Sequence, residues 1–186
     1  ANIEKAEAVM PSGSRGPATA NLLLIDTPNQ HSIEDVSNFL AISAAQCLKT
    51  LIVKGQEEGG LLALLLRGDH ELNKIKAEKI DGVASPLEFA SEDDIQRTCN
   101  CKPGSIGPLG LTIPIIADRS VVVISDFVCG ANEDGKHYQG VNWERDLSVP
   151  VLIADIRTVV EGDPSPDGKG EITLARGIEV GHIFQL

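Results

Sequence analysis

Apolar residues along the chain mostly follow the alternation and the short continuous runs that are typical of β-strands. The clearest case is 48–54, where Lys49, Leu51 and Val53 continue the face of Cys47 and the residues between them form the other face. A turn at 56–60 joins this segment to the next apolar run and indicates a β-hairpin. Strands are predicted at 22–25, 48–54, 61–66, 112–117, 121–124, 171–175 and 178–184.

Three segments carry helical periodicity or helix-capping residues. The first, at about 33–44, places its apolar residues on one face and begins after Ser32, a good N-cap. The second begins at Asp69 and reaches about Lys79, with its charged side chains interpreted as a solvated face, and Ser91 caps a third, short helix. The order β-α-β-β-α-α-β-β-β-β favours a mixed sheet with few helices, of the α+β or α/β kind.

One polar stretch, 130–146, concentrates rare side chains. It holds the only Tyr, the only Trp and His137, and it follows the apolar run at 121–124. A loop presented by a rigid strand is a common place for functional groups. Spacing alone leaves two interpretations open, a functional loop or a long surface turn that contains a histidine.

Lys49 and a loop at 102–110 each have a structural and a functional interpretation. Lys49 shares its strand face with apolar or weakly polar groups, so it either extends from a sheet edge to water or points into a pocket that needs a cation. The loop contains Gly and Pro at five of its nine positions, and its unhindered amides can approach a carbonyl or phosphate oxygen. A plain structural turn has the same composition. The loop lacks the Lys-Ser/Thr end of a Walker loop, so nucleotide hydrolysis is unsupported.

Composition limits the classes of function. With 186 residues, 42% of them hydrophobic and only 3% aromatic, the chain can form one domain with an aliphatic core. Its net charge of -11 argues against a large nucleic-acid footprint, although a small pocket for one nucleotide end remains compatible. No apolar segment is long enough to cross a membrane. The chain starts with Ala1 and stops inside an apparent strand, which predicts a piece of a larger protein.

The four cysteines do not have the spacing of a zinc site, so buried, reduced thiols are expected. No Ser-His-Asp order or His-Glu-x-x-His motif is present either. An enzyme built from this chain is therefore expected to lack a metal and a covalent nucleophile, which leaves attack by a positioned water with stabilisation from loop amides. The uncommitted polar groups are Thr27, Lys49, Asp118, His137 and the amides of 104–108.

Several motifs along the chain, in order, resemble one family. They are Leu-Lys-Thr-Leu at 48–51, Arg-Gly-Asp-His-Glu-Leu-Asn at 67–73, the loop at 104–108, Ser-Asp-Phe at 125–127, Asp-Gly-Lys-His-Tyr at 134–138, Asn-Trp at 142–143 and Ala-Asp-Ile-Arg at 154–157. This middle part is similar to the editing insertion of bacterial prolyl-tRNA synthetase and to the free-standing YbaK/ProX-type aminoacyl-tRNA deacylases. The segments at 1–7 and 176–186 resemble the class II catalytic core of that synthetase.

The resemblance implies a YbaK-like fold, with a mixed, partly barrel-like sheet surrounded by a few helices. It divides the chain into a flank from the synthetase core at 1–20, an editing domain at 21–165 and a return into the core at 166–186. The implied activity is hydrolysis of alanine mischarged onto the proline tRNA. A synthetic site rejects a smaller apolar amino acid poorly, so a second and tighter site removes the error and excludes proline by size.

By position, the resemblance also implies roles for particular residues. Lys49, Gly104 and His137 are the expected catalytic residues: Lys49 contacts the terminal phosphate or ribose, Gly104 belongs to the amides that hold the scissile carbonyl, and His137 contacts the substrate near its amino group or adenosine. The family mechanism relies on the substrate's own ribose hydroxyl and a bound water. The expected substrate-binding residues are Thr27, Val36, Cys47, Leu51, Ser105, Ile106, Gly107, Pro108 and Asp118.

The expected surroundings follow from the same resemblance. No cofactor is expected in this domain, because ATP and Mg belong to the parent synthetase core. The expected partners are the 3′ end of alanyl-tRNA(Pro) and the rest of a cytoplasmic, homodimeric prolyl-tRNA synthetase, with no membrane. Two alternatives stay open, a free-standing deacylase that acts in trans and a non-catalytic structural insertion. The core-like ends favour the insertion over the free-standing enzyme.

Overall fold

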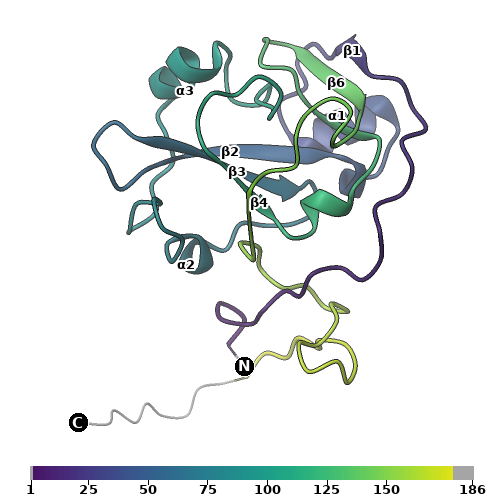
Figure 1. Ribbon diagram of the computed structural model, residues 1–186, viewed down its shortest axis with the longest axis vertical. Helices are drawn as coiled ribbons and strands as arrows, with labels where there is room; N and C mark the ends of the chain where they lie inside the picture. Colours follow the sequence, from purple (N-terminus) through teal and green to yellow (C-terminus); the bar gives the residue numbers. More distant parts are fainter. Residues whose placement is uncertain (1, 178–186) are drawn as a thin grey trace.

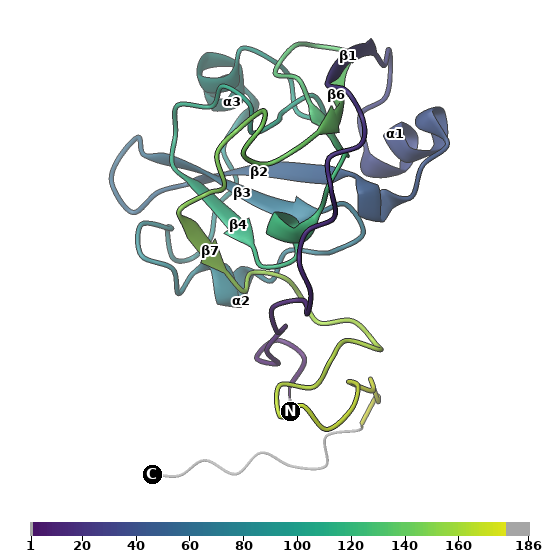
Figure 2. The ribbon, with the colours of Figure 1, turned by 45° about the vertical axis from the view of Figure 1, so that its right-hand side comes forward.

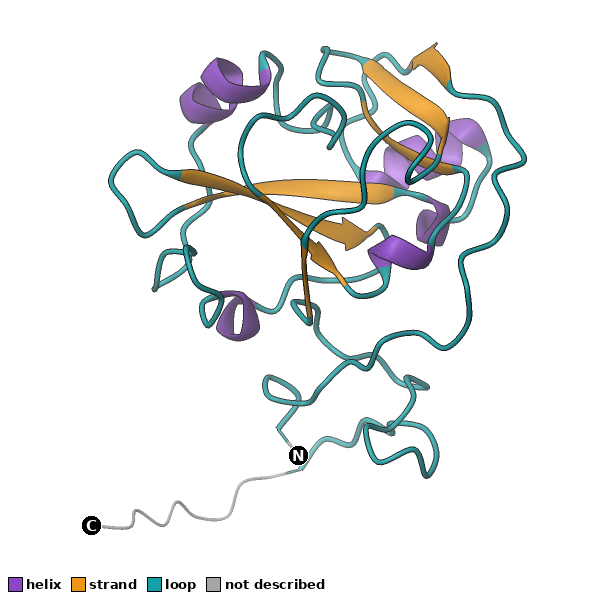
Figure 3. Ribbon diagram, viewed as in Figure 1, coloured by secondary structure: helices purple, strands orange, loops and turns teal. Residues whose placement is uncertain are grey.

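The computed structural model describes residues 2–177, which form a mixed α+β fold with two β-sheets and few helices (Figures 1 and 3). The sheets do not close into a barrel within this range. The strands are β1 (Leu23–Asp26), β2 (Leu48–Lys54), β3 (Leu61–Arg67), β4 (Ile115–Asp118), β5 (Phe127–Gly130), β6 (Lys136–Val141) and β7 (Leu152–Ala154). The helices are α1 (Ile33–Leu40), α2 (Lys74–Ala77) and α3 (Glu92–Cys99), with 3₁₀ turns η1 (Ala44–Gln46) and η2 (Val121–Val123).

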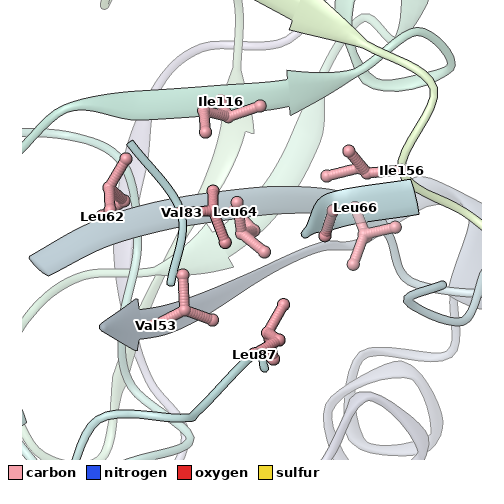
Figure 4. Packing of buried hydrophobic residues seen from close by; sticks show 9 residues of the cluster. Val53, Leu62, Leu64, Leu66, Val83, Leu87, Ile116 and Ile156 are labelled. Atoms are coloured by element: carbon pink, nitrogen blue, oxygen red, sulfur yellow. The ribbon is translucent and has the colours of Figure 1, made fainter. Parts of the chain in front are cut away.

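The larger sheet has the strand order β2-β3-β4-β7 and supplies most of the core. β2 and β3 form the expected antiparallel hairpin, whereas β3–β4 and β4–β7 are parallel. β3 is buried on both faces, which explains its continuous apolar sequence rather than an alternating one. One face packs on aliphatic side chains only, as Figure 4 shows for Val53, Leu62, Leu64, Leu66, Val83, Leu87, Ile116 and Ile156.

The smaller sheet, β1-β6-β5, is antiparallel and adjoins the larger one at β2. The two sheets meet at an isolated parallel bridge between Cys47 and Val128. Beside this junction, the rings of Phe127 and Trp143 contact each other with centroids 5.2 Å apart and planes tilted by 41°, and the Trp143 indole N–H donates to the Val121 carbonyl at 3.1 Å. The edge of β2 therefore lies close to the second sheet.

Two of the three predicted helix starts are confirmed, and one is wrong. Ser32 and Ser91 cap α1 and α3, but α1 ends at Leu40 because Ala41 takes a left-handed conformation (φ 54°). The helix predicted from Asp69 to Lys79 begins only after Asn73, since the Asp69 carboxylate binds Arg67 instead.

The charged residues of this second helix do not all form a solvated face. Lys76 is buried, and its ammonium donates to both oxygens of Asp155 at 2.9 Å. The same ammonium donates to the Arg157 carbonyl at 2.8 Å. This buried pair fixes α2 to the segment that follows β7.

Several strand predictions need correction. The β-branched run at 121–124 forms the turn η2, and the supposed loop at 130–146 contains β6. β5 and β7 were not predicted, and β4 covers only the second half of 112–117. The segment 171–175 makes only an isolated bridge, between Glu171 and Pro164. The strand predicted at 178–184 lies outside the described residues.

The first and last described segments, at 2–7 and 165–177, lie next to each other below the sheets (Figures 1 and 2). The Ala8 amide donates to Asp155 at 3.0 Å, and Arg119 reaches both Glu7 and the Ala8 carbonyl, at 2.7 and 3.0 Å. The Asn73 side chain donates to the Glu4 carbonyl at 3.0 Å. None of the helices in residues 2–177 has the length and apolar character that a membrane span requires.

Candidate active site

A cavity of about 580 Å³ lies along the outer edge of β2, between the two sheets and α1. Residues from α1, β2, the loop at 104–106, β5 and β6 line it. It brings together predicted site residues from distant parts of the sequence, namely Val36, Cys47, Lys49, Leu51, Gly104, Ile106 and His137. The Lys49 strand and the Gly104 loop thus share one cavity.

Lys49 contributes the positive charge of this cavity. Its side chain is 17% exposed, and its ammonium lies 3.1 Å from the Glu71 carboxylate, which is itself mostly in water. Such a half-exposed ion pair contributes at most about 1 kcal/mol, so Glu71 can give way to another anion. Lys49 is therefore neither fully solvated nor locked into the core.

Within 104–108, two amides have no acceptor among the described residues. The Ser105 amide donates to the Lys102 carbonyl at 3.3 Å, the Gly107 amide donates to Asn132 at 2.8 Å, and Pro108 has no N–H. The amides of Gly104 and Ile106 remain, and these two residues are the ones from this loop that line the cavity. Two neighbouring free amides form a small site for an anionic or carbonyl oxygen.

Glycine is required where this loop packs against its neighbours. Gly104 has φ 100°, and a Cβ there would lie 2.8 Å from the His31 carbonyl oxygen. A Cβ on Gly107 would overlap the Gly130 carbonyl, and one on Gly130 would overlap the Ser105–Ile106 backbone. The loop is thus held between the start of α1 and the end of β5 by direct backbone contact.

His137 lies on β6, where it pairs with Gly130 of β5 on one side and Ile25 of β1 on the other. Its Nδ1 is 2.6 Å from the Thr27 hydroxyl, in a buried pair. Burial lowers the pKa of His137, and a hydrogen bond from the ring to the Gly104 backbone, which raises the pKa and therefore goes to the carbonyl, opposes this shift only in part. The imidazole therefore stays neutral at pH 7 and links Thr27 to the Gly104 loop.

The inner wall of the cavity is apolar. Val36, Cys47 and Val128 form one buried cluster and all line the cavity. Burial raises the pKa of the Cys47 thiol to about 11, so this group is not a thiolate at neutral pH. All four cysteines are free and buried, as expected from their spacing.

Five predicted residues do not line the cavity. Ser105, Gly107 and Pro108 belong to the loop but do not line the cavity: the Ser105 hydroxyl accepts from the Gly135 amide, and the Gly107 amide donates to Asn132. Thr27 is bonded to His137 and is likewise absent from the lining. Asp118 is not brought to the site. It is 1% exposed, and its oxygens accept from Ser120 and from the Ile156 amide, so it fixes the end of β4 to the segment after β7.

Several residues that line the cavity were not predicted from the sequence. Val128 was missed because β5 was not predicted, whereas Glu71 lies in the motif at 67–73 and could have been found from it. Gly68 allows the Ala44 carbonyl to approach closely, which positions η1 beside the cavity. The additional lining residues are His31, Thr50, Gly68, Glu71, Val128 and Gly130, among others.

No group of three or more His, Cys, Asp or Glu side chains within the described range is placed to hold a metal ion. The cavity itself offers a cation, two free amides and an aliphatic wall. These groups fit the recognition of a small apolar moiety attached to a polar, anionic remainder. The expectation that the domain needs no cofactor stays a prediction.

Comparisons with known proteins identify the family and the fold. The family model for the aminoacyl-tRNA editing domain matches residues 27–147. A solved structure of a proposed trans-editing enzyme for prolyl-tRNA synthetase is similar with TM-score 0.61 and 17% identity, over 73% of this chain and 86% of that chain. The hypothetical protein APE2540 is similar with TM-score 0.59 and 21% identity, over 75% of this chain and 91% of that chain. At these identities the two structures show a shared fold, while the family model matches well over half of the sequence. The chain therefore belongs to the aminoacyl-tRNA editing domain family.

Proposed function

We propose that the chain hydrolyses the ester of alanine mischarged onto the proline tRNA, as the editing insertion of a prolyl-tRNA synthetase. The editing family as such implies aminoacyl-tRNA deacylation. One observation carries the finer assignment. The free amides of Gly104 and Ile106 share a cavity with the Lys49 ammonium, and its inner wall is the small apolar cluster of Val36, Cys47 and Val128.

Each part of the cavity matches one part of an alanyl ester. The apolar wall receives the methyl side chain, and Lys49 binds the ribose–phosphate end. The Gly104 and Ile106 amides donate to the ester carbonyl and stabilise the negative charge that develops on it when water attacks. The bond from the carbonyl carbon to the ribose oxygen then breaks, and that oxygen takes a proton to give free alanine and uncharged tRNA.

A general base from the protein is not required in this scheme. His137 is already engaged by Thr27 and by the Gly104 backbone, and Cys47 is protonated at neutral pH. The adjacent ribose hydroxyl of the substrate therefore activates the water. In this scheme His137 and Thr27 hold the Gly104 loop in place, and Asp118 acts only through the fold.

The acidic surface and the arrangement of the ends support the inserted context. A net charge of -11 leaves little attraction for the tRNA body, which the parent synthetase would hold elsewhere. The segments at 2–7 and 165–177 line one cavity below the sheets, and in the inserted context they would join the catalytic core of a cytoplasmic, homodimeric enzyme (Figure 2). The alternative is a free-standing deacylase acting in trans, as the fold relative described as a trans-editing enzyme illustrates.

Substrate size tests the proposed function. The chain should cleave alanyl-tRNA about 100-fold faster than prolyl-tRNA, because the apolar wall admits a methyl group and excludes a pyrrolidine ring. Cys47→Ala should enlarge the cavity and lower the ratio of the alanyl to the prolyl cleavage rate by a factor of about ten. Cys99→Ala removes a buried thiol that does not line the cavity and should leave the preference unchanged.

The assay measures initial deacylation rates on alanyl-, cysteinyl- and prolyl-tRNA and on the corresponding short adenosine esters. Equal rates on the alanyl and prolyl esters would refute the size selection. A large gain from the full tRNA over the short ester would favour the free-standing enzyme, whereas similar rates on both would favour the insertion. A folded chain that cleaves none of these esters would support a non-catalytic insertion.

A further inference from the structure

Thr50 carries a polar atom that the fold leaves without a partner. The residue is 8% exposed and lines the cavity, and its hydroxyl oxygen is buried without a hydrogen bond to any residue of the described part of the chain. Within residues 2–177, only one other buried side-chain nitrogen or oxygen, Nη1 of Arg15, shares this condition. Unpaired buried hydroxyls destabilise a folded protein, so one at a cavity wall points to a ligand group that completes it.

The backbone of Thr50 also faces away from the sheet. The Ala90 amide donates to the Ile52 carbonyl, and the Lys54 amide donates to the Glu88 carbonyl, so the backbone groups of Ile52 and Lys54 point outward from β2. Backbone direction alternates along an antiparallel strand, so the N–H and C=O of Thr50 point the same way.

This outer edge of β2 is covered only at its two ends. Within the described residues, Cys47 pairs with Val128 at one end and Val53 pairs with Phe89 at the other. No backbone bridge covers Thr50 between them. Thr50 therefore presents a carbonyl, an amide and a hydroxyl beside the cavity.

The burial of Thr50 indicates which part of the substrate can reach it. A nearly buried residue meets the aminoacyl end of a tRNA, because the rest of the tRNA must extend to water. That end has an ester carbonyl, which needs donors, and an α-ammonium group, which needs acceptors. The carbonyl and hydroxyl oxygens of Thr50 are acceptors.

Lys49 does not oppose a second cation at this point. Successive side chains of a strand point to opposite faces, so the Lys49 side chain leaves β2 on the other side from Thr50. Its charge is also paired with Glu71 at 3.1 Å. The Thr50 side of the edge is thus separated from the Lys49 ammonium.

On the basis of the proposed deacylase function, we propose that Thr50 binds the α-ammonium group of the aminoacyl ester. Thr50 is then a substrate-binding residue that selects esters with a free amino group. It orients the ester so that the carbonyl meets the amides of Gly104 and Ile106. An N-blocked or deaminated acyl group loses this contact.

A pair of non-hydrolysable ligands tests this assignment. They are adenosine amides carrying an alanyl or a propionyl group at the 3′ position, which differ only in the α-amino group. Isothermal titration should show that the wild-type chain binds the alanyl amide about tenfold tighter, as expected for a hydrogen bond to a charged group. In Thr50→Val, which keeps the shape but removes the hydroxyl, this ratio should fall to about twofold.

Thr50→Ser is the matched control, because it retains the hydroxyl and should retain most of the preference. The melting temperature of Thr50→Val should be unchanged or higher, since the lost hydroxyl had no partner. A Thr50→Val variant that keeps the full tenfold preference would overturn the assignment and leave the deacylase function intact. A wild-type chain that binds neither amide would overturn the proposed function, and the Thr50 assignment with it.

Discussion

Replacing Lys49 by alanine should lower kcat/KM for alanyl-tRNA deacylation about 100-fold, the effect of losing a strong charged hydrogen bond to the substrate. The melting temperature should hardly change, because Lys49 makes only a half-exposed pair with Glu71. The measurement is the initial rate of deacylation together with a thermal unfolding curve for each protein.

Lys54→Ala provides the matched control for this substitution. Lys54 lies at the end of the same strand and makes a similar ion pair, 2.6 Å from Glu88, but it does not line the cavity. Its replacement should leave deacylation unchanged. If Lys49→Ala folds and stays fully active, Lys49 is not needed for catalysis and the catalytic assignment fails. If Lys49→Ala unfolds the protein, Lys49 has a structural role and the assignment fails as well.

Replacing Gly104 by alanine should reduce kcat about 100-fold, in the range seen when one donor to a developing oxyanion is lost. A Cβ at this position would lie 2.8 Å from the His31 carbonyl, so the loop must move and carry its free amides away from the substrate. The effect should appear in kcat more than in KM, because these amides act mainly on charge that develops in the transition state.

Gly110→Ala separates this displacement from the cost of a left-handed backbone. Gly110 has φ 78° in the same loop, but none of the atoms in residues 2–177 lies within 4 Å of a Cβ built there. Both variants should lose some stability, about 1–3 kcal/mol from the strained backbone. Only Gly104→Ala should lose deacylation, and equal losses in the two variants would show that the loop amides are not specifically involved.

Local pattern was sufficient for the parts of the fold that depend on neighbouring residues. The alternation at 48–54 predicted β2, and Ser91 with its carboxylate partner predicted α3, because caps and strand faces are short-range features. β6 escaped detection because its sequence, Lys-His-Tyr-Gln-Gly-Val, is polar and contains a glycine. β6 is stabilised as a strand because it pairs with β1 on one side and β5 on the other, and such pairing between distant segments cannot be read from local sequence.

The run at 121–124 illustrates the opposite error. Three successive valines favour a strand, yet they form the turn η2, where the Val121 carbonyl accepts from Trp143. Tertiary packing overrides local propensity here. The sequence also could not show that the Gly107 amide is used by Asn132, so the predicted set of loop donors was too large.

The site residues also divide into those that local sequence indicated and those that depend on tertiary structure. Lys49, Gly104 and His137 were named from a resemblance together with their local chemistry, and one cavity contains all three. Asp118 was named on the same basis but supports the fold, since its partners Ser120 and Ile156 depend on the path of the chain after β7. The proposed role of Thr50 could not be predicted from the sequence, because it rests on a side-chain hydroxyl that has no hydrogen-bond partner within residues 2–177.

The most direct measurement locates the bound substrate group. In an NMR titration of nitrogen-labelled protein with the alanyl adenosine amide, the amide signals of Gly104, Ile106 and His137 should shift, together with those of Lys49 and Thr50. A second cavity, of about 1120 Å³, lies far from these residues in sequence, between the segments 2–7 and 159–177. Shifts confined to that second cavity, with the Gly104 loop unaffected, would contradict an editing site at the edge of β2.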